Sequence, residues 1–477
     1  MTVVGAGAAG LFCALAAARA GARVALVSSS PLPASASYWA QGGIAAALAL
    51  DDSPERHAED TLAAGRGAAR PSAVRVLCEG SPERVHELQE LGVRFDADRH
   101  GALALGLEGG HSRRRIVHAG GAATGRRITR ELSALAAVHE RIDVLERSTA
   151  TALLVSEGRC GGVAVAGAEG ELDVVSRGTV LATGGAAALW ARTTNPPGSV
   201  GVALSLAHAA GAEVADLELA QFHPTALVVD GRGDGFLMTE ALRGEGATLL
   251  DAAGERFVDE LAPRDEVALA IESVLRHSGR RSVSLDMRAV DMARFPNIAD
   301  TLLDAGIDPR RETIPVAPAA HYTMGGVATD LDGRASLPGL LAVGECACTG
   351  LHGANRLASN SLAECFVLGR RAAHAASEQP PGADPGGGKR VRLPAPPSPR
   401  TRTALWRHAG LRREAEGLHE LERDPYPLAR LIAAACLARE ESRGAHQRTD
   451  FPRTDPALEE RHAVVGADGR VVFERWE

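Results

Sequence analysis

The first ten residues constrain the fold more than any other part of the chain. A short apolar run at residues 2–4 is followed by Gly5-Ala6-Gly7-Ala8-Ala9-Gly10, an alanine-rich stretch and a second apolar run. This order of strand, glycine loop, helix and strand is the setting in which a G-x-G-x-x-G pattern binds a dinucleotide. Gly5 permits the turn, Gly7 lets pyrophosphate approach the backbone, and Gly10 lets helix and strand pack closely. The helix N-terminus would then face the phosphates. The predicted contacts are Gly5, Gly7, Ala8, Ala9 and Gly10.

The second strand lacks a residue that such domains usually carry. An acidic side chain commonly ends this strand and binds the ribose. Here Ser28-Ser29-Ser30 stands at that point, so the ribose contact is predicted to be weaker or to use Ser28. The chain also begins almost inside its first strand, and we therefore expect the natural start to lie further upstream.

Two later segments have the form of strands that end at a ligand. Val180-Leu181-Ala182 runs into Thr183-Gly184, and the apolar run 340–343 ends in Gly344-Glu345. Doubly wound sheets bind ligands outside the carboxyl ends of their strands. Thr183, Gly184 and Glu345 are therefore predicted to contact the cofactor, Glu345 at a ribose. An ordinary strand exit and a solvated turn glutamate remain the alternatives.

The segment from Thr349 to Leu362 places an arginine, a histidine, two asparagines and three hydroxyls beside tight glycines. It is too polar for a core and too rich in donors for an idle loop. Arg356 is suited to grip a carboxylate through two parallel hydrogen bonds. Together with the glycine loop, the segment predicts a flavin held from both ends of the chain, with Arg356 facing an anionic substrate.

Composition excludes several other classes. A chain of 477 residues is long enough for two or three domains with a large core. The net charge of −8 provides no basic excess for nucleic acid. Cys346 and Cys348 are the only close pair among seven cysteines, and no fourth zinc ligand is evident, so free thiols in a reducing cytoplasm and no metal are expected. No signal peptide or membrane span is predicted.

Longer motifs follow the glycine loop in order and extend over nearly the whole chain. They are Ala40-Gln41-Gly42-Gly43-Ile44-Ala45, Gln221-Phe222-His223-Pro224-Thr225, Thr239-Glu240-Ala241-Leu242-Arg243-Gly244-Glu245-Gly246-Ala247, Pro263-Arg264-Asp265, His321-Tyr322-Thr323-Met324-Gly325-Gly326 and His352-Gly353-Ala354-Asn355-Arg356. With the glycine loop they resemble the succinate dehydrogenase/fumarate reductase flavoprotein superfamily.

Finer details resemble one branch of that superfamily. Respiratory members carry a histidine that bonds covalently to FAD, and its place here is Ala36, so the resemblance implies non-covalent FAD. The segment from Glu108 to Ala119 and the alanines in Thr239–Ala247 resemble the L-aspartate oxidase family. One departure is the loop Pro197–Gly201, which is shorter than the family's and lacks its aspartate. Together with Ser28, it predicts weak retention of FAD.

The resemblance assigns roles to residues across these motifs. Glu108 would repel a plain dicarboxylate but attract the ammonium of aspartate, and Arg264 would transfer a proton, tuned by Glu240 or Glu245. For any of these side chains a structural role is the alternative. The implied catalytic residues are Arg264, His223 and His321; the substrate-binding residues are Arg356, Thr239, Glu108 and Glu240; the added cofactor contacts are Gln41, Gly42, Gly43, Asn360, Ser361 and Leu362.

The resemblance also implies an activity. It is the FAD-dependent oxidation of L-aspartate to iminoaspartate, with dioxygen or fumarate as electron acceptor. This is the first step of de novo NAD biosynthesis, with functional coupling to quinolinate synthase. Two alternatives remain open: a soluble fumarate reductase or succinate dehydrogenase-type flavoprotein, and a flavin-binding or apo protein that acts as a partner subunit without turnover.

The implied architecture is an α/β, Rossmann-like FAD-binding domain with an inserted α+β capping domain and a C-terminal helical domain. Amphipathic helices are predicted at 404–421 and 428–439. The FAD-binding domain would comprise residues 1–215 and 323–377, the capping domain 216–322, a Pro/Gly-rich linker 378–400, and the helical domain 401–477.

Overall fold

The computed structural model describes residues 1–231, 233–380 and 388–477. Its central element is a parallel sheet of five strands in the order β17-β10-β1-β2-β6. Thr2 pairs with both Thr179 and Ala25, so the glycine-loop strand lies in the middle of this sheet. The carboxyl ends of these strands meet at one edge, as predicted for a doubly wound domain. The strands are β1 (Thr2–Val4), β2 (Val24–Val27), β6 (Ile142–Leu145), β10 (Thr179–Leu181) and β17 (Leu340–Ala342).

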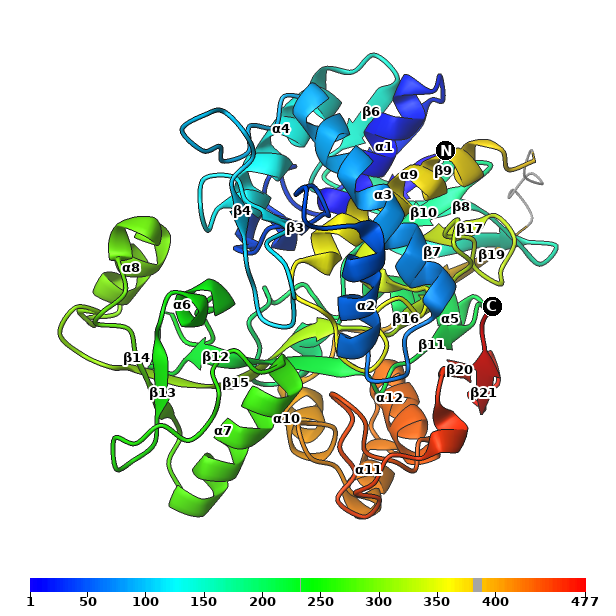
Figure 1. Ribbon diagram of the computed structural model, residues 1–477. Helices are drawn as coiled ribbons and strands as arrows, with labels where there is room; N and C mark the ends of the chain where they lie inside the picture. The colour runs from blue at the N-terminus through cyan, green and yellow to red at the C-terminus, as the bar shows by residue number, and fades with distance from the viewer. Residues whose placement is uncertain (232, 381–387) are drawn as a thin grey trace.

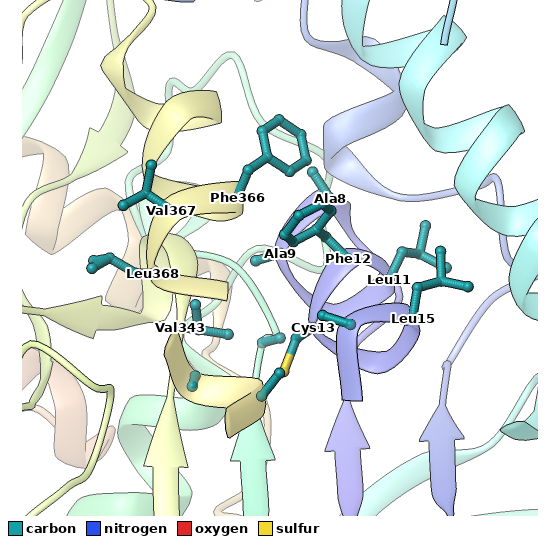
Figure 2. Close-up of a cluster of buried hydrophobic side chains, with 14 of the residues drawn as sticks. Ala8, Ala9, Leu11, Phe12, Cys13, Leu15, Val343, Phe366, Val367 and Leu368 are labelled. Carbon is teal, nitrogen blue, oxygen red and sulfur yellow. The ribbon is translucent and has the colours of Figure 1, made fainter. Parts of the chain in front are cut away.

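Two helices from opposite ends of the sequence pack together above this sheet. Helix α1 (Ala8–Arg19) follows the glycine loop, and α9 (Asn360–Ser377) follows the polar segment 349–362. Phe12 of α1 meets Phe366 of α9 edge to face, with 5.2 Å between ring centroids (Figure 2). The apolar core around them brings residues 8 and 362 into one layer, so both helix N-termini lie above the same sheet edge.

Other helices and strands complete the FAD-binding domain. Helices α3 and α4 cover the same core as α1 (Figure 1). The remaining elements are α2 (Pro54–Ala64), α3 (Pro71–Glu90), α4 (Thr124–Val138), α5 (Val202–Ala209), β3 (Ile44–Ala45), β4 (Leu105–Gly106), β5 (Ile116–Val117), β7 (Thr149–Ser156), β8 (Arg159–Gly167), β9 (Gly170–Val175), β11 (Val214–Ala215), β16 (Gly326–Ala328) and β18 (Ala347–Cys348).

The predicted capping domain forms a separate lobe, green in Figure 1. Its antiparallel sheet has the order β12-β15-β14-β13 and carries its own apolar core around Leu242, Ile271 and Ile314. The elements are β12 (Ala220–Leu227), β13 (Thr248–Leu250), β14 (Val283–Asp286), β15 (Ile314–Thr323), α6 (Glu240–Gly244), α7 (Arg264–Ser278) and α8 (Pro296–Asp304). The mixed α and β content agrees with the predicted α+β character, while the domain boundaries themselves stay a prediction.

The C-terminal region differs in detail from the sequence expectation. The helix predicted at 404–421 is two helices, α10 (Pro399–His408) and α11 (Ala415–Leu421), and α12 (Pro427–Ala438) follows. Strands β20 (Arg461–Val465) and β21 (Val471–Arg475) then extend the sheet of β11, so this region is not purely helical. Within the predicted linker, β19 (Lys389–Arg392) pairs with β7, whereas residues 381–387 lie outside the described residues.

In residues 1–231, 233–380 and 388–477, no helix is both long and apolar enough to cross a membrane. These residues contain no group of three or more histidine, cysteine or acidic residues placed to hold a metal ion. All seven cysteines are free; Cys365 is half-buried and the others are buried, and burial raises the pKa of the Cys346 thiol to about 12.

Candidate active site

The glycine loop forms a cradle in which the backbone leaves no room for side chains. Gly5 has φ +110°, and a Cβ there would lie 2.3 Å from the carbonyl oxygen of Ala182. A Cβ at Gly10 would lie 1.9 Å from the carbonyl oxygen of Gly5. Helix α1 therefore starts directly against the ends of β1 and β10. Its N-terminus has no side-chain cap of its own, and Ala8 N–H donates to the Ser37 hydroxyl at 3.0 Å. Such a helix end suits a pyrophosphate.

A second close approach occurs at Gln41-Gly42-Gly43. A Cβ at Gly43 would lie 2.5 Å from the carbonyl oxygen of Val117. Gly43 N–H donates to the Ser359 hydroxyl at 3.1 Å, which joins this segment to the start of α9. Gln41 donates to the carbonyl of Leu237 in the cap, but its Oε1 is buried with no partner in the described part of the chain. A buried orphan acceptor next to glycines is what a bound cofactor would satisfy.

The other predicted cofactor residues have mixed surroundings. Ser28 donates its hydroxyl to the carbonyl of Ser30 at 2.7 Å, so this group closes a turn. Thr183 accepts from Ala203 N–H at 3.1 Å, next to the shortened loop, and Gly184 has φ +74°.

At the start of α9, the polar side chains are already bonded within the protein, so mainly backbone groups are available to a cofactor. The Asn360 amide is bound by His57 at 2.8 Å and Thr61 at 3.0 Å. Ser361 accepts from Arg356 at 3.3 Å, and Leu362 belongs to the apolar core. The backbone of this turn carries the positive end of the helix dipole.

Glu345 is a half-buried residue in the 3-10 turn Gly344–Cys346, which follows the carboxyl end of β17. Its Oε1 accepts from Thr323 N–H at 3.0 Å, and burial raises its pKa to about 7. A Cβ at Gly185 would lie 2.1 Å from the same oxygen. The side chain is therefore not the solvated turn glutamate of the alternative interpretation.

The substrate half of the site consists of buried charged and polar side chains that come from four distant segments. Arg264, the first residue of α7, donates to Glu240 at 2.7 Å and to Gln221 Oε1 at 3.1 Å. Arg356 donates to the same Gln221 oxygen at 3.2 Å. Burial favours the neutral form of Glu240, but the charges of Arg264 and Arg243 hold its pKa below the usual range. The result is a buried pair of guanidinium groups that share one neutral acceptor.

Arg356 is held rigidly but has donor capacity left. Its guanidinium lies 4.6 Å from the centroid of the Tyr322 ring. The Tyr322 hydroxyl is fixed in turn by His352 at 3.2 Å and Glu364 at 3.0 Å. Arg356 Nε is buried without a hydrogen-bond partner in the described residues. Burial and the charge of Arg264 lower its pKa to about 10, so it stays cationic at neutral pH and is suited to an anion.

The rings of the two predicted histidines meet edge to face, and burial keeps both neutral. The rings of His223 and His321 are 5.2 Å apart between centroids. His223 Nδ1 accepts from Thr225 N–H at 3.2 Å, which leaves the proton of the neutral ring on Nε2. His321 Nδ1 is 2.8 Å from the hydroxyl of Thr194. Burial, and after it the nearby arginine charges, lower the pKa of both rings well below the usual value.

Glu108 and Thr239 complete the set. Glu108 is 7% exposed and accepts from the Ser359 hydroxyl at 2.6 Å. The next residue, Gly109, has Glu240 Oε1 2.1 Å from the position a Cβ would take, so the Glu108 turn lies against the cap. Thr239 is buried at the N-terminus of α6, and its hydroxyl makes no capping hydrogen bond.

The structure excludes one predicted partner of Arg264, and it shows contacts made by residues to which the sequence analysis gave no role. Glu245 pairs with the exposed Arg294 at the surface, so it does not tune Arg264. Gln221 bridges the two arginines, although the sequence marked it only as part of a motif. Arg66 holds the first turn of α7 through a bidentate ion pair with Asp265 (2.9 and 3.1 Å). Neither contact has a signal in local sequence spacing.

The glycine-rich half and the charged half of the site fit two ligands, a flavin dinucleotide and a dicarboxylate. Close-packed glycines, two helix N-termini and an orphan amide oxygen suit the phosphates and ring of FAD. Ala36, in a short 3-10 turn (Ala36–Trp39), has no side chain that could bond to it. Two arginines and two neutral histidine donors suit a dicarboxylate. Fold and site together define an FAD-dependent oxidoreductase.

Comparison with known proteins agrees with this class. An FAD-binding domain model matches residues 1–362, and the fumarate reductase flavoprotein C-terminal model matches 422–474. The E. coli quinol fumarate reductase FrdA superposes with a TM-score of 0.89 at 29% identity, covering 99% of this chain and 95% of its own. A quinol–fumarate reductase solved with menaquinol molecules gives 0.90 at 28%, covering 100% and 97%.

Sequence relatives narrow the family. The L-aspartate oxidase of Caulobacter vibrioides is 47% identical over 95% of this chain and 94% of its own length. That of Streptomyces coelicolor is 42% identical over 98% and 91%. The chain belongs to the L-aspartate oxidase family within the succinate dehydrogenase/fumarate reductase flavoproteins.

Proposed function

We propose that this protein oxidises L-aspartate to iminoaspartate with FAD as its non-covalent cofactor. The observation that carries the proposal is the meeting of Arg264, Arg356 and Glu108 in one buried site beside the glycine cradle. Aspartate has two carboxylates and one ammonium, so it needs two cationic places and one anionic place. The site offers all three.

Each side chain contributes positioning or charge. Arg356 grips one carboxylate, and its free Nε adds a donor. His223, His321 and Thr239 donate hydrogen bonds as neutral groups, and Glu108 attracts the ammonium. Bound FAD supplies the acceptor for the hydride that leaves the α-carbon. The cap, which carries Arg264 and Glu240, excludes water from the substrate.

Arg264 serves the reverse direction of electron flow. The same dicarboxylate site would accept fumarate, and Arg264 would deliver the proton that fumarate reduction needs. Its link to Glu240 at 2.7 Å gives this arginine a buried acidic partner. Dioxygen or fumarate then serves as electron acceptor. The reaction is the first step of de novo NAD biosynthesis, and we propose that it takes place in the cytoplasm and supplies quinolinate synthase.

An anaerobic flavin experiment tests this proposal. The purified protein is supplied with FAD and mixed without oxygen with L-aspartate or with succinate while the flavin absorbance is followed. Bleaching by L-aspartate, with iminoaspartate or its hydrolysis product oxaloacetate formed, supports the oxidase. Bleaching by succinate alone would favour the fumarate reductase or succinate dehydrogenase alternative, and a protein that binds no FAD would favour a partner subunit without turnover.

Arg356→Lys provides a matched variant for the same experiment. It keeps the positive charge but loses the planar fork. We expect a KM for L-aspartate that rises about tenfold or more, because a bidentate charge-assisted pair is lost. An unchanged KM would remove Arg356 from the substrate site.

A further inference from the structure

Ser359 has a conformation that its position in the chain does not explain. It precedes α9 as the N-cap residue, where serine usually has an extended backbone and accepts a hydrogen bond from the helix. Here its φ is +61°, in the left-handed region that favours glycine, and its hydroxyl makes no cap bond. A strained residue at a site suggests that the strain serves the site.

The Ser359 hydroxyl is instead used across the site. It accepts from Gly43 N–H at 3.1 Å and donates to Glu108 Oε2 at 2.6 Å. Because Gly43 N–H is a donor only and the Glu108 carboxylate an acceptor only, the direction of both bonds is fixed. Ser359 is 6% exposed and Glu108 7%, so water does not compete freely for this short, charge-assisted bond.

A second bond fixes the same turn from the other side. His111, three residues after Glu108, lies 2.9 Å from the carbonyl of Ala358, the residue before Ser359. Arg115 approaches His111 Nδ1 at 3.1 Å as a donor, so the ring proton is on Nε2 and is donated to Ala358. The turn that carries Glu108 is therefore attached to residues 358 and 359 by two directed hydrogen bonds.

These bonds leave one carboxylate oxygen uncommitted. Oε1 of Glu108 lies 3.8 Å from the position that a Cβ would take at Gly42, within the predicted flavin-binding segment. Glu108 is also close enough to Arg356 for its charge to oppose the lowering of the Arg356 pKa. Oε1 thus lies beside the cofactor segment, and Glu108 is within electrostatic reach of the carboxylate-binding arginine, as a partner for an α-ammonium would have to be.

We propose that Ser359 is a positioning residue that holds Glu108 by Oε2 and leaves Oε1 for the ammonium of an amino dicarboxylate. The site then prefers an amino dicarboxylate to a plain dicarboxylate. This inference rests on the proposed function. It assigns no contact between Ser359 and the substrate, because the single donor of the hydroxyl is used by Glu108 and the hydroxyl also accepts from Gly43.

A double-mutant cycle tests the inference. Ser359→Ala, Glu108→Gln and the double variant are compared with wild type at saturating FAD, and kcat/KM is measured for L-aspartate oxidation and for fumarate reduction. We expect Ser359→Ala to lower the value for L-aspartate about tenfold. The double variant should be no worse than Glu108→Gln alone, and fumarate reduction should stay within about twofold. Additive losses, or equal losses with both substrates, would overturn the inference.

Two further variants serve as a substitute for Ser359→Ala and as a control. Ser359→Gly removes the hydroxyl but tolerates φ +61°, so it replaces the alanine variant if that one does not fold or hold FAD. Ser377→Ala deletes an exposed hydroxyl that bonds the carbonyl of Ala373 at the far end of α9, and both activities should be unchanged. Failure of wild type to oxidise L-aspartate would defeat the proposed function; normal wild-type oxidation with an additive cycle would defeat only the role of Ser359.

Discussion

The cofactor half and the substrate half of this site are built by opposite physical means. The cofactor half depends on close backbone approach, since a Cβ at Gly5, Gly10 or Gly43 would come within 2.5 Å of a carbonyl oxygen. The substrate half depends on buried charge, since Arg264 and Arg356 share the Gln221 oxygen and Glu240 balances them. The first half should fail when an atom is added, and the second when a charge is removed.

Arg264→Gln should have the largest effect of the changes considered. It removes the group proposed to transfer the proton and leaves Glu240 buried without its closest partner. We expect kcat for fumarate reduction to fall by about a thousandfold, within the range for a general acid. Arg276→Gln, in the last turn of the same helix at 65% exposure, is the control and should change little. If Arg264→Gln kept a tenth of the activity, proton transfer would have to use another group.

Gly10→Ala tests the other half. The new methyl group would collide with the Gly5 carbonyl oxygen, a backbone atom that is costly to displace. We expect FAD affinity to fall about a hundredfold, a cost of about 3 kcal/mol at the upper end for overpacking. Fluorescence titration with FAD measures it.

Gly369→Ala is the matched control for this test. It lies in α9 in the same layer, with its nearest contacts at 3.5 Å, so a methyl group is accommodated and helix propensity improves. Its FAD affinity should match that of wild type. A Gly10→Ala protein that binds FAD equally well would show that the cradle is not sterically limited.

The same contrast explains what the sequence could predict. The cradle lies within ten consecutive residues, and its glycines have fixed spacing, so the strands, α1 and the sheet edge followed from pattern alone. The shared Gln221 oxygen could not be predicted from the sequence. It accepts from Arg264, which is 43 positions away, and from Arg356, which is 135 positions away. Glu245 illustrates the converse: its nearness to Glu240 in the sequence suggested a shared role, but the helix turn directs it to Arg294 at the surface.

Glu345 allows a test of how burial in the cofactor half changes the ionisation of a carboxyl group. Its pKa is about 7 in the folded protein against 4.5 for the free group, because burial disfavours the carboxylate. Between these values the folded state binds more protons than the unfolded state, so stability falls as pH rises through 4.5 to 7 and levels off above. Glu345→Gln removes this pH-dependent contribution to the free energy of unfolding.

We expect wild type to lose about 2 to 3 kcal/mol relative to Glu345→Gln across that pH window. Urea unfolding of the FAD-free proteins between pH 4.5 and 8 measures it, and the difference between the two proteins cancels all other titrating groups. A constant difference would mean that folding leaves the pKa of Glu345 unchanged, so that burial does not disfavour its carboxylate.

The substitution with the smallest expected effect, Glu108→Gln, distinguishes L-aspartate oxidation from fumarate reduction. Glu108→Gln keeps the size of the side chain and its bond from Ser359 but removes the charge that an ammonium would need. We expect kcat/KM for L-aspartate to fall about tenfold, as for loss of one charged hydrogen-bond partner. Fumarate reduction should be kept or increased, because an anion that repels a dicarboxylate has been removed. Equal loss of both activities would mean that Glu108 supports the turn and does not sense the amine, and the preference for aspartate would then have to arise within the cap.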